Sequence, residues 1–504
     1  MHKRSLGIAL SYVNTFASMV CGIVLSSVLL RSIGDEEYGL YQTISSFANY
    51  LVMLEFGTGT AMSRAIVIYK NSPRRNRINN CVSTIWYMTV GLAVLIIAVS
   101  CVFYMNIGRI YRASMTTQQI DYARSLFVFI TVYLVMNYLR QTMNGVLLGM
   151  EQYTFSSMVS TANTVVRTAL LLALIFFRPY ASTIVIVDVC LSVIAFSATF
   201  LFCKKKFAIK LKLSLFDRRI VVEFLPLCLA LVLQTFVNQA NNSVDKFFIG
   251  IQMNMTSVAI YSVAQYIYSV FSSITTIPIS MYLPQVGKDI AKGLEGKELT
   301  ETFIQPCRFV ALLGGSVVFG FVAVGRPFIS VLYGQSKEMA WLYALIIMVP
   351  MFVNMTDGIL VNVLDVRNKR HVRSYALVGT TILNIAMTVW FISMWGIIGA
   401  VIATAIATTL GQILFMNWYY KKAFDIQVLY LFRSAYKGIL PFQILAAGVC
   451  CFFTYHISSA LQALFLGGIA YVILSGGLII VFGLNTQEKT VLTKLARRFT
   501  NLYR

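Results

Sequence analysis

Long apolar runs alternate with short polar segments along the whole chain. A helix that crosses a bilayer needs about 20 consecutive, mostly apolar residues, and these runs lack the strict apolar–polar alternation of membrane β-strands. The pattern therefore predicts an all-α polytopic membrane protein with about 14 transmembrane helices. The predicted spans are 8–30, 39–61, 81–104, 122–145, 154–176, 181–203, 221–243, 258–282, 308–333, 340–363, 374–395, 397–420, 437–456 and 460–484.

Composition supports a membrane protein and excludes a soluble enzyme. Apolar residues make up 58% of the chain and charged residues 12%, and the mean hydropathy is +0.75. Soluble domains carry about twice that share of charge, because they must cover a surface in contact with water. The chain has 41 Lys and Arg against 19 Asp and Glu, a net charge of +22. In a soluble protein such an excess would suggest nucleic acid, whereas in a membrane protein it can set the orientation.

The positions of the basic residues favour orientation over nucleic-acid binding. Between the predicted spans, 31 of the 41 basic residues fall in alternate segments and seven fall in the other set. Cytoplasmic loops are the ones enriched in Lys and Arg. We therefore expect both termini to be cytoplasmic, and we expect no nucleic-acid partner. We also expect the protein to lie in the cytoplasmic membrane of a bacterium. The most basic segment, 204–220, is interpreted either as a solvated linker or as an amphipathic strip that contacts anionic membrane lipids.

The sequence offers no set of catalytic or metal-binding residues. It contains three histidines and nine cysteines with no CxxC pair, and it has no P-loop, HExxH or GxSxG motif. The predicted outer loops are short, which disfavours a membrane glycan polymerase or glycosyltransferase. We expect no enzyme activity, no cofactor and no metal.

Several motifs resemble the oligosaccharide flippases of the MOP superfamily, in the Wzx-like polysaccharide transporter branch. The motifs are LLRSIGDEEYGLYQ (29–42), LEFGTGTAMSR (54–64), VLLGMEQY (146–153), VAIYSVAQ (258–265) and GIIGAVIATAIATTLGQ (396–412). The resemblance implies two pseudo-symmetric six-helix lobes and two additional C-terminal helices. It assigns 1–203 to the first lobe, 204–220 to the linker, 221–420 to the second lobe, and 421–504 to the extra helices and tail.

The same resemblance implies a function. Such proteins move a polyprenyl-diphosphate-linked oligosaccharide from the inner to the outer leaflet by alternating access, here as a monomeric transport unit. A cation-coupled multidrug exporter on the same scaffold is the alternative.

Polar side chains inside the predicted spans indicate where water or a headgroup could pass. Such residues are costly against lipid, so they face a cavity or another helix. One interpretation is a polar cleft, and the alternative is that these groups only join helices. The cavity-lining candidates are Asn14, Gln42, Asn49, Asn137, Gln141, Asn144, Asn163, Gln234, Asn238, Asn241, Asn242 and Gln265.

Charged residues inside the spans are the strongest candidates for substrate binding and ion coupling. Arg140 and Arg167 are predicted to bind the substrate diphosphate, because guanidinium pairs bidentately with phosphate oxygens. The alternative is an internal ion pair or a misplaced span boundary. Asp357, Asp245 and Asp188 are candidates for binding a coupling proton or sodium ion. Asp357 lies one helical turn from Asn354, while Asp245 could instead neutralise Lys246.

Overall fold

The computed structural model describes residues 2–51, 55, 57–70, 76–207, 209, 211–485 and 488–489. Within these helices, the side chains outside the description are those of 2–17, 70, 76–77, 227, 230, 233–234, 236–238, 240–242, 277–278, 280–281 and 283–284. The chain divides into two compact units, Met1–Ser262 and Val263–Arg504. The lobe boundaries expected from the sequence stay a prediction.

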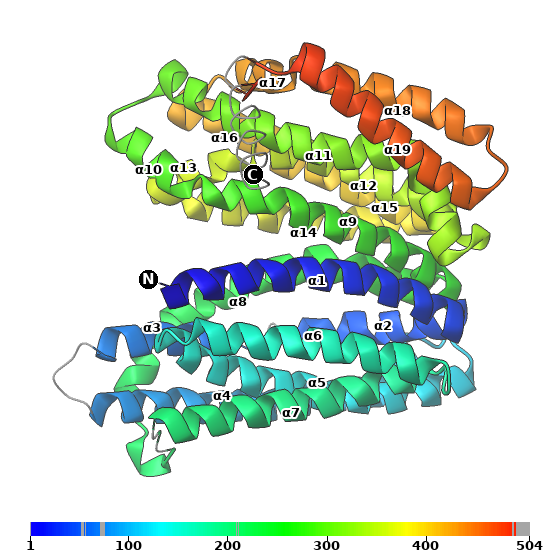
Figure 1. The fold of residues 1–504 in the computed structure, drawn as a ribbon. Coiled ribbons are helices and arrows are strands. Elements are labelled where there is room, and N and C mark those ends of the chain that lie inside the picture. Colours follow the sequence, from blue (N-terminus) through cyan, green and yellow to red (C-terminus); the bar gives the residue numbers. More distant parts are fainter. Residues whose placement is uncertain are drawn as a thin grey trace, which may run out of the picture. The chain divides into compact units, whose positions relative to one another are not determined.

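Unit 1 consists of long helices that run roughly side by side (Figure 1). Its elements are α1 (His2–Ile33), α2 (Asp35–Leu51), α3 (Thr58–Lys70), α4 (Asn76–Ile110), α5 (Thr117–Gly149), α6 (Tyr153–Ile175), α7 (Ala181–Phe207), the 3-10 helix η2 (Leu213–Leu215), α8 (Arg218–Gln252) and the first part of α9 (Met255–Met281).

Unit 2 begins within α9 and repeats this all-helical character. Its further helices are α10 (Leu283–Ala291), α11 (Gly296–Tyr333), α12 (Met339–Thr356), α13 (Val361–Val366), α14 (Arg370–Trp395), α15 (Ile397–Thr408), α16 (Phe415–Phe424), α17 (Val428–Tyr436), α18 (Leu440–Tyr455) and α19 (Ala460–Leu478). Short 3-10 turns η3 (Gln335–Lys337) and η4 (Gly358–Leu360) and π-helices η5 (Thr409–Leu414) and η6 (Ile479–Gly483) complete it.

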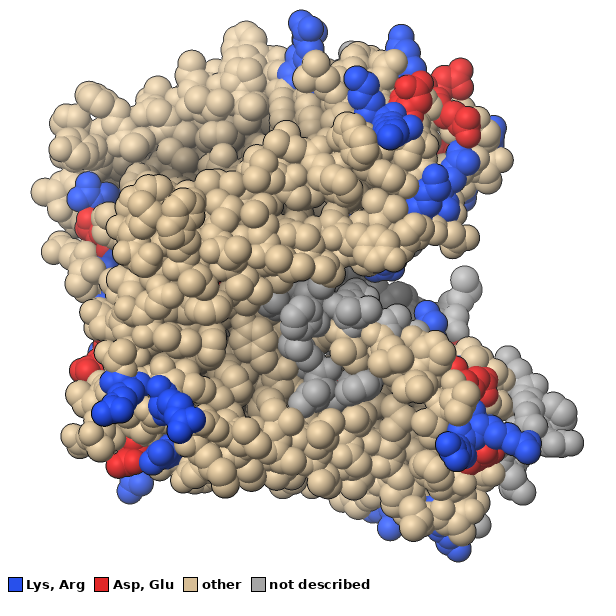
Figure 2. Space-filling view, turned by 180° about the vertical axis from the view of Figure 1, so that it is seen from behind, with Lys and Arg blue, Asp and Glu red and all other residues tan. Residues whose placement is uncertain are grey.

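The membrane-protein class predicted from the sequence is confirmed. In the described residues, nine helices are long and apolar enough to cross a membrane, or ten if α17 and α18, bent by 50°, form one span. Helices occupy most of each of the 14 predicted ranges within the described residues, and residues 52–54 and 56 of the range 39–61 lie outside the description. The number of 14 crossings stays a prediction. In each unit, charged side chains gather towards the helix ends and leave an uncharged band between them (Figure 2). Such a band is what contact with lipid requires.

The helices α3, α4 and α5 pack closely because small residues and hydroxyl groups meet between them. A Cβ at Gly145 of α5 would overlap the carbonyl oxygen of Gly59 in α3. The buried hydroxyl of Thr142 lies 2.8 Å from that of Thr58 and 3.3 Å from that of Thr89. Close backbone approach and hydrogen bonds between helices replace the hydrophobic effect as a cause of association in lipid.

Candidate functional site

A bidentate ion pair joins two membrane-spanning helices of unit 1. The guanidinium of Arg167 in α6 donates to Asp188 in α7, from Nε to Oδ1 at 2.5 Å and from Nη2 to Oδ2 at 2.9 Å. The side chains are 33% and 11% exposed, respectively. Arg167, a diphosphate candidate, and Asp188, an ion-coupling candidate, are therefore brought together and neutralise each other in this structure.

Two tyrosines accompany this ion pair. Tyr41 of α2 and Tyr133 of α5 both interact electrostatically with Arg167 and Asp188. Tyr41 did not stand among the sequence candidates, whereas Tyr133 lies four residues before the candidate Asn137 and thus on the same helical face. Four helices therefore contribute to one polar cluster inside unit 1.

Arg140 of α5 has a different environment from Arg167. Its Nε and Nη2 donate to Oδ1 of Asn137 on the preceding turn, at 3.3 and 2.9 Å. It also interacts electrostatically with Glu55. In the described part of the chain, no carboxylate lies within ion-pair distance of Arg140. Its charge is therefore less fully compensated than that of Arg167, which leaves it more available to an anionic ligand.

The remaining polar candidates have varied surroundings. Asn144 accepts a hydrogen bond from Ser156 at 2.6 Å, which joins α5 to α6. Gln265 is 8% exposed in unit 2. Asn49 and Gln141 are exposed, and Asn163 is partly buried. The side chains that lie outside the described set are those of Asn14, Gln234, Asn238, Asn241 and Asn242.

The neighbouring residues Asp245 and Lys246 of α8 face different partners. The carboxylate of Asp245, 4% exposed, accepts a hydrogen bond from Tyr261 of α9. The ammonium of Lys246 instead lies 3.4 Å from Oε1 of Gln42 in α2. Asp245 is thus held by a neutral donor, and it does not form an ion pair with the adjacent lysine.

Asp357 lies in unit 2 where the chain leaves one helix and begins the next. α12 ends at Thr356 and η4 begins at Gly358, so Asp357 occupies the break between them. Its side chain is 3% exposed, and Oδ2 has no hydrogen-bond partner in the described part of the chain. Interrupted membrane helices often mark ion or substrate sites.

A cavity of about 330 Å³ adjoins Asp357. Asn354 and Gln412 also line it, and the Asn354 amide donates to the Gln412 carbonyl at 3.0 Å. Gln412 belongs to η5, and π-helical turns are frequent at functional sites. Arg370 and Arg373 line the same cavity. Asp357 is therefore the ion-coupling candidate with a free carboxylate oxygen next to open space.

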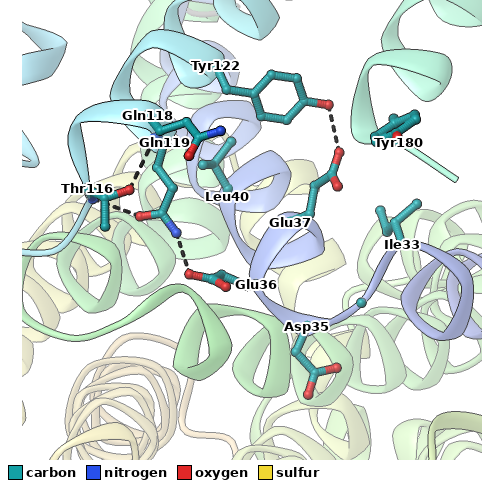
Figure 3. A pocket seen from close by; sticks show the side chains of 11 residues that line it. Ile33, Asp35, Glu36, Glu37, Leu40, Thr116, Gln118, Gln119, Tyr122 and Tyr180 are labelled. Atoms are coloured by element: carbon teal, nitrogen blue, oxygen red, sulfur yellow. Dashed lines mark hydrogen bonds between the residues drawn. The ribbon is translucent and has the colours of Figure 1, made fainter.

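A second cavity, of about 700 Å³, lies in unit 1 beside the turn between α1 and α2 (Figure 3). Glu37 accepts from the Tyr122 hydroxyl and from the Ala181 backbone N–H, each at 2.6 Å. Glu36 accepts from the Gln119 side chain. These carboxylates tie the start of α2 to α5 and α7, so this part of the IGDEEYGLY motif has a structural role.

The long apolar helices of both units define a polytopic membrane protein. The chain belongs to the polysaccharide biosynthesis protein family, whose model matches residues 7–288. This match covers more than half of the chain. No curated protein matches the sequence.

Two examples represent the solved structures that are similar in fold. One is described as lipid II flippase MurJ in an inward closed conformation, with a TM-score of 0.66, 16% identity, and coverage of 94% of this chain and 99% of that chain. The other is an inward-facing multidrug resistance MATE family transporter of the MOP superfamily, with a TM-score of 0.63, 16% identity, and coverage of 86% and 99%. Family and fold together place the chain among MOP-superfamily transporters rather than enzymes, as the sequence motifs predict.

Proposed function

We propose that the protein flips a polyprenyl-diphosphate-linked oligosaccharide from the inner to the outer leaflet of a bacterial cytoplasmic membrane, with both termini cytoplasmic. The observation that carries this proposal is Arg140, a membrane-helix guanidinium with no carboxylate within ion-pair distance among the described residues, in a member of a polysaccharide biosynthesis family. Such a guanidinium suits the diphosphate of a lipid-linked glycan.

The physical problem is the charge of the headgroup. An isolated charge costs tens of kcal/mol in a hydrocarbon environment, so a diphosphate cannot cross unaided. A guanidinium in a polar passage compensates that charge without breaking a bond, and alternating access then exposes the passage to each side in turn. Arg140 binds the diphosphate directly in this proposal. Arg167 joins after the diphosphate displaces Asp188 from it.

Asp357 is the carboxylate that we assign to ion coupling. Asp188 is engaged by Arg167 and Asp245 by Tyr261, whereas Oδ2 of Asp357 has no partner among the described residues and lies at a cavity. Arg373 interacts electrostatically with Asp357, and a proton or a sodium ion at this oxygen would further offset the cost of the buried carboxylate charge.

Depletion of the protein followed by lipid analysis tests the function. If the proposal holds, intact polyprenyl-diphosphate glycan accumulates and stays inaccessible to glycan-modifying reagents added outside. The fold is also that of a MATE transporter, so a cation-coupled drug exporter is the second candidate. Unchanged lipid-linked glycans together with increased sensitivity to cationic drugs would contradict the flippase and favour the exporter.

A further inference from the structure

Lys246 is a partly buried cation in unit 1 with no charged partner. All 19 acidic residues lie in the described part of the chain, and none of them forms an ion pair with this lysine. Its only hydrogen bond among the described residues is the 3.4 Å contact from Nζ to Oε1 of Gln42. An ammonium group donates three hydrogen bonds, so two N–H groups remain for another acceptor.

The adjacent carboxylate does not supply that acceptor. Asp245 accepts from Tyr261, and consecutive side chains on an α-helix point about 100° apart. Asp245 therefore faces α9 while Lys246 faces α2. A charge that is partly removed from water and has no counter-charge is costly, so its presence at this position points to a function.

Close helix packing fixes the position of Lys246. A Cβ at Gly250, one turn further along α8, would overlap the Thr43 side chain of α2. The Gln42 amide donates from Nε2 to the Tyr38 hydroxyl at 2.9 Å, and this bond turns its Oε1 towards Lys246. The ammonium and the amide that orients it are thus held between two packed helices.

Arg140, Arg167 and Lys246 stand at different levels along the helices of unit 1. Arg140 lies nine residues from the end of α5, and Arg167 lies 14 residues from the start of α6, at the same end of the bundle. At about 1.5 Å per residue, these positions are roughly 14 and 21 Å from that end. Lys246 lies six residues from the opposite end, which is the end of α8.

We propose that Lys246, oriented by Gln42, is a second diphosphate-binding position, near the predicted outer end of the path that begins at Arg140. The proposal rests on the proposed function, because it takes the cargo to be a lipid diphosphate. The ammonium binds phosphate oxygens as a point charge and needs no bidentate geometry, which suits a position from which the cargo is released.

Binding of farnesyl diphosphate to the purified full-length protein tests this assignment. This probe carries the same diphosphate on a short prenyl chain, and farnesol is the neutral control ligand. Lys246→Gln is expected to weaken farnesyl diphosphate binding about tenfold, since a hydrogen bond to a charged group contributes on that scale. Lys246→Arg keeps the affinity, and farnesol binding stays unchanged in both variants.

Lys205→Gln is the matched control, because it removes one positive charge from an exposed position of unit 1. It should leave the affinity unchanged. Lys246→Gln should also keep or raise the melting temperature, because it removes an unpaired charge. Equal farnesyl diphosphate affinity of Lys246→Gln and the unchanged protein would overturn the Lys246 assignment alone, as would a parallel loss of farnesol binding. If the unchanged protein bound no farnesyl diphosphate, the proposed cargo itself would be wrong.

Discussion

The two arginines that the sequence predicts to bind the diphosphate have different partners in the structure. Arg167 makes a bidentate ion pair with Asp188, whereas Arg140 contacts only the neutral amide of Asn137 among its described hydrogen-bond partners. An anion at Arg140 need displace only a weak acceptor, while an anion at Arg167 must first compete with a carboxylate. The two residues therefore have different roles in binding a diphosphate.

Loss of the Arg167–Asp188 ion pair is expected to lower the stability of the folded protein. Asp188→Asn leaves the guanidinium without its counter-charge, and breaking a buried pair in this way costs about 3–5 kcal/mol. Since one third of the Arg167 side chain is exposed, we expect about 2 kcal/mol here. Thermal unfolding in detergent should show a lowered melting temperature for Asp188→Asn. The double variant Arg167→Gln/Asp188→Asn should recover most of the lost melting temperature. If the losses of melting temperature in the two single variants simply added up in the double variant, the pairing would be contradicted.

A transport assay separates the role of the positive charge of Arg167 from that of its planar guanidinium. Arg167→Lys keeps the positive charge but not the planar fork, so it should retain more transport than Arg167→Ala. The measurement is the rate of lipid-linked glycan translocation in cells that express each variant at equal level. Full activity of Arg167→Ala would remove this residue from the mechanism.

This ion pair could have been predicted from the sequence. Arg167 lies eight residues before the end of α6, and Asp188 lies seven residues after the start of α7. Two antiparallel helices joined by a short turn bring residues at equal distances from the turn to the same level. The interaction of Arg140 with Glu55 carries no such signal, because it depends on how distant helices pack.

At the scale of helices, the apolar pattern predicts positions well and interruptions poorly. The predicted spans 154–176 and 181–203 fall on α6 and α7 with small shifts at their ends. The predicted span 340–363, by contrast, is interrupted at Asp357, and 397–420 contains the π-helix η5. These breaks depend on local hydrogen bonding, to which an average of hydropathy is insensitive. The Asp357 site therefore emerges fully only from the structure.

A buried arginine attaches the C-terminal helices to α11. Arg308 is 2% exposed and donates to the carbonyl oxygens of Ser434, Lys437 and Gly483 at 3.0, 2.7 and 3.0 Å. It also donates to both carboxylate oxygens of Glu488, at 2.8 and 3.2 Å. One guanidinium thus joins the ends of α17 and η6 and the segment that follows to α11.

This attachment should weaken in acid. Burial raises the pKa of Glu488, but the hydrogen bonds from Arg308 and from the Asn485 backbone N–H outweigh it and hold the pKa below its ordinary 4.5. A depressed pKa contributes stability above the unfolded-state pKa, and this contribution is lost as the pH falls through the folded-state value. Limited proteolysis of the C-terminal helices should therefore accelerate below about pH 4.5.

Glu488→Gln provides the control for this pH dependence. It should be cleaved faster than the unchanged protein at neutral pH, with little further acceleration in acid. An unchanged acid response in Glu488→Gln would contradict the assignment to this carboxylate.

At the scale of the whole molecule, the sequence predicts the class but not the arrangement of the cationic groups. Continuous apolar runs are enough to predict an all-helical membrane protein, and the motifs are enough to predict the MOP superfamily, which the family match and the fold confirm. Tertiary contacts determine which cations have a counter-charge, as Lys246 illustrates. From the sequence, Asp245 could neutralise this lysine. In the structure the two side chains contact different helices.

Translocation of a fluorescent polyprenyl-diphosphate oligosaccharide in proteoliposomes tests the central claim most directly. A membrane-impermeant quencher reports the fraction of label in the outer leaflet over time. We expect rapid exchange with the unchanged protein and a rate lowered about ten- to hundredfold in Arg140→Gln. Arg124→Gln, which alters an ion-paired arginine of the same helix, should exchange normally. Exchange no faster than in protein-free liposomes, or equal rates for Arg140→Gln and the unchanged protein, would contradict the account.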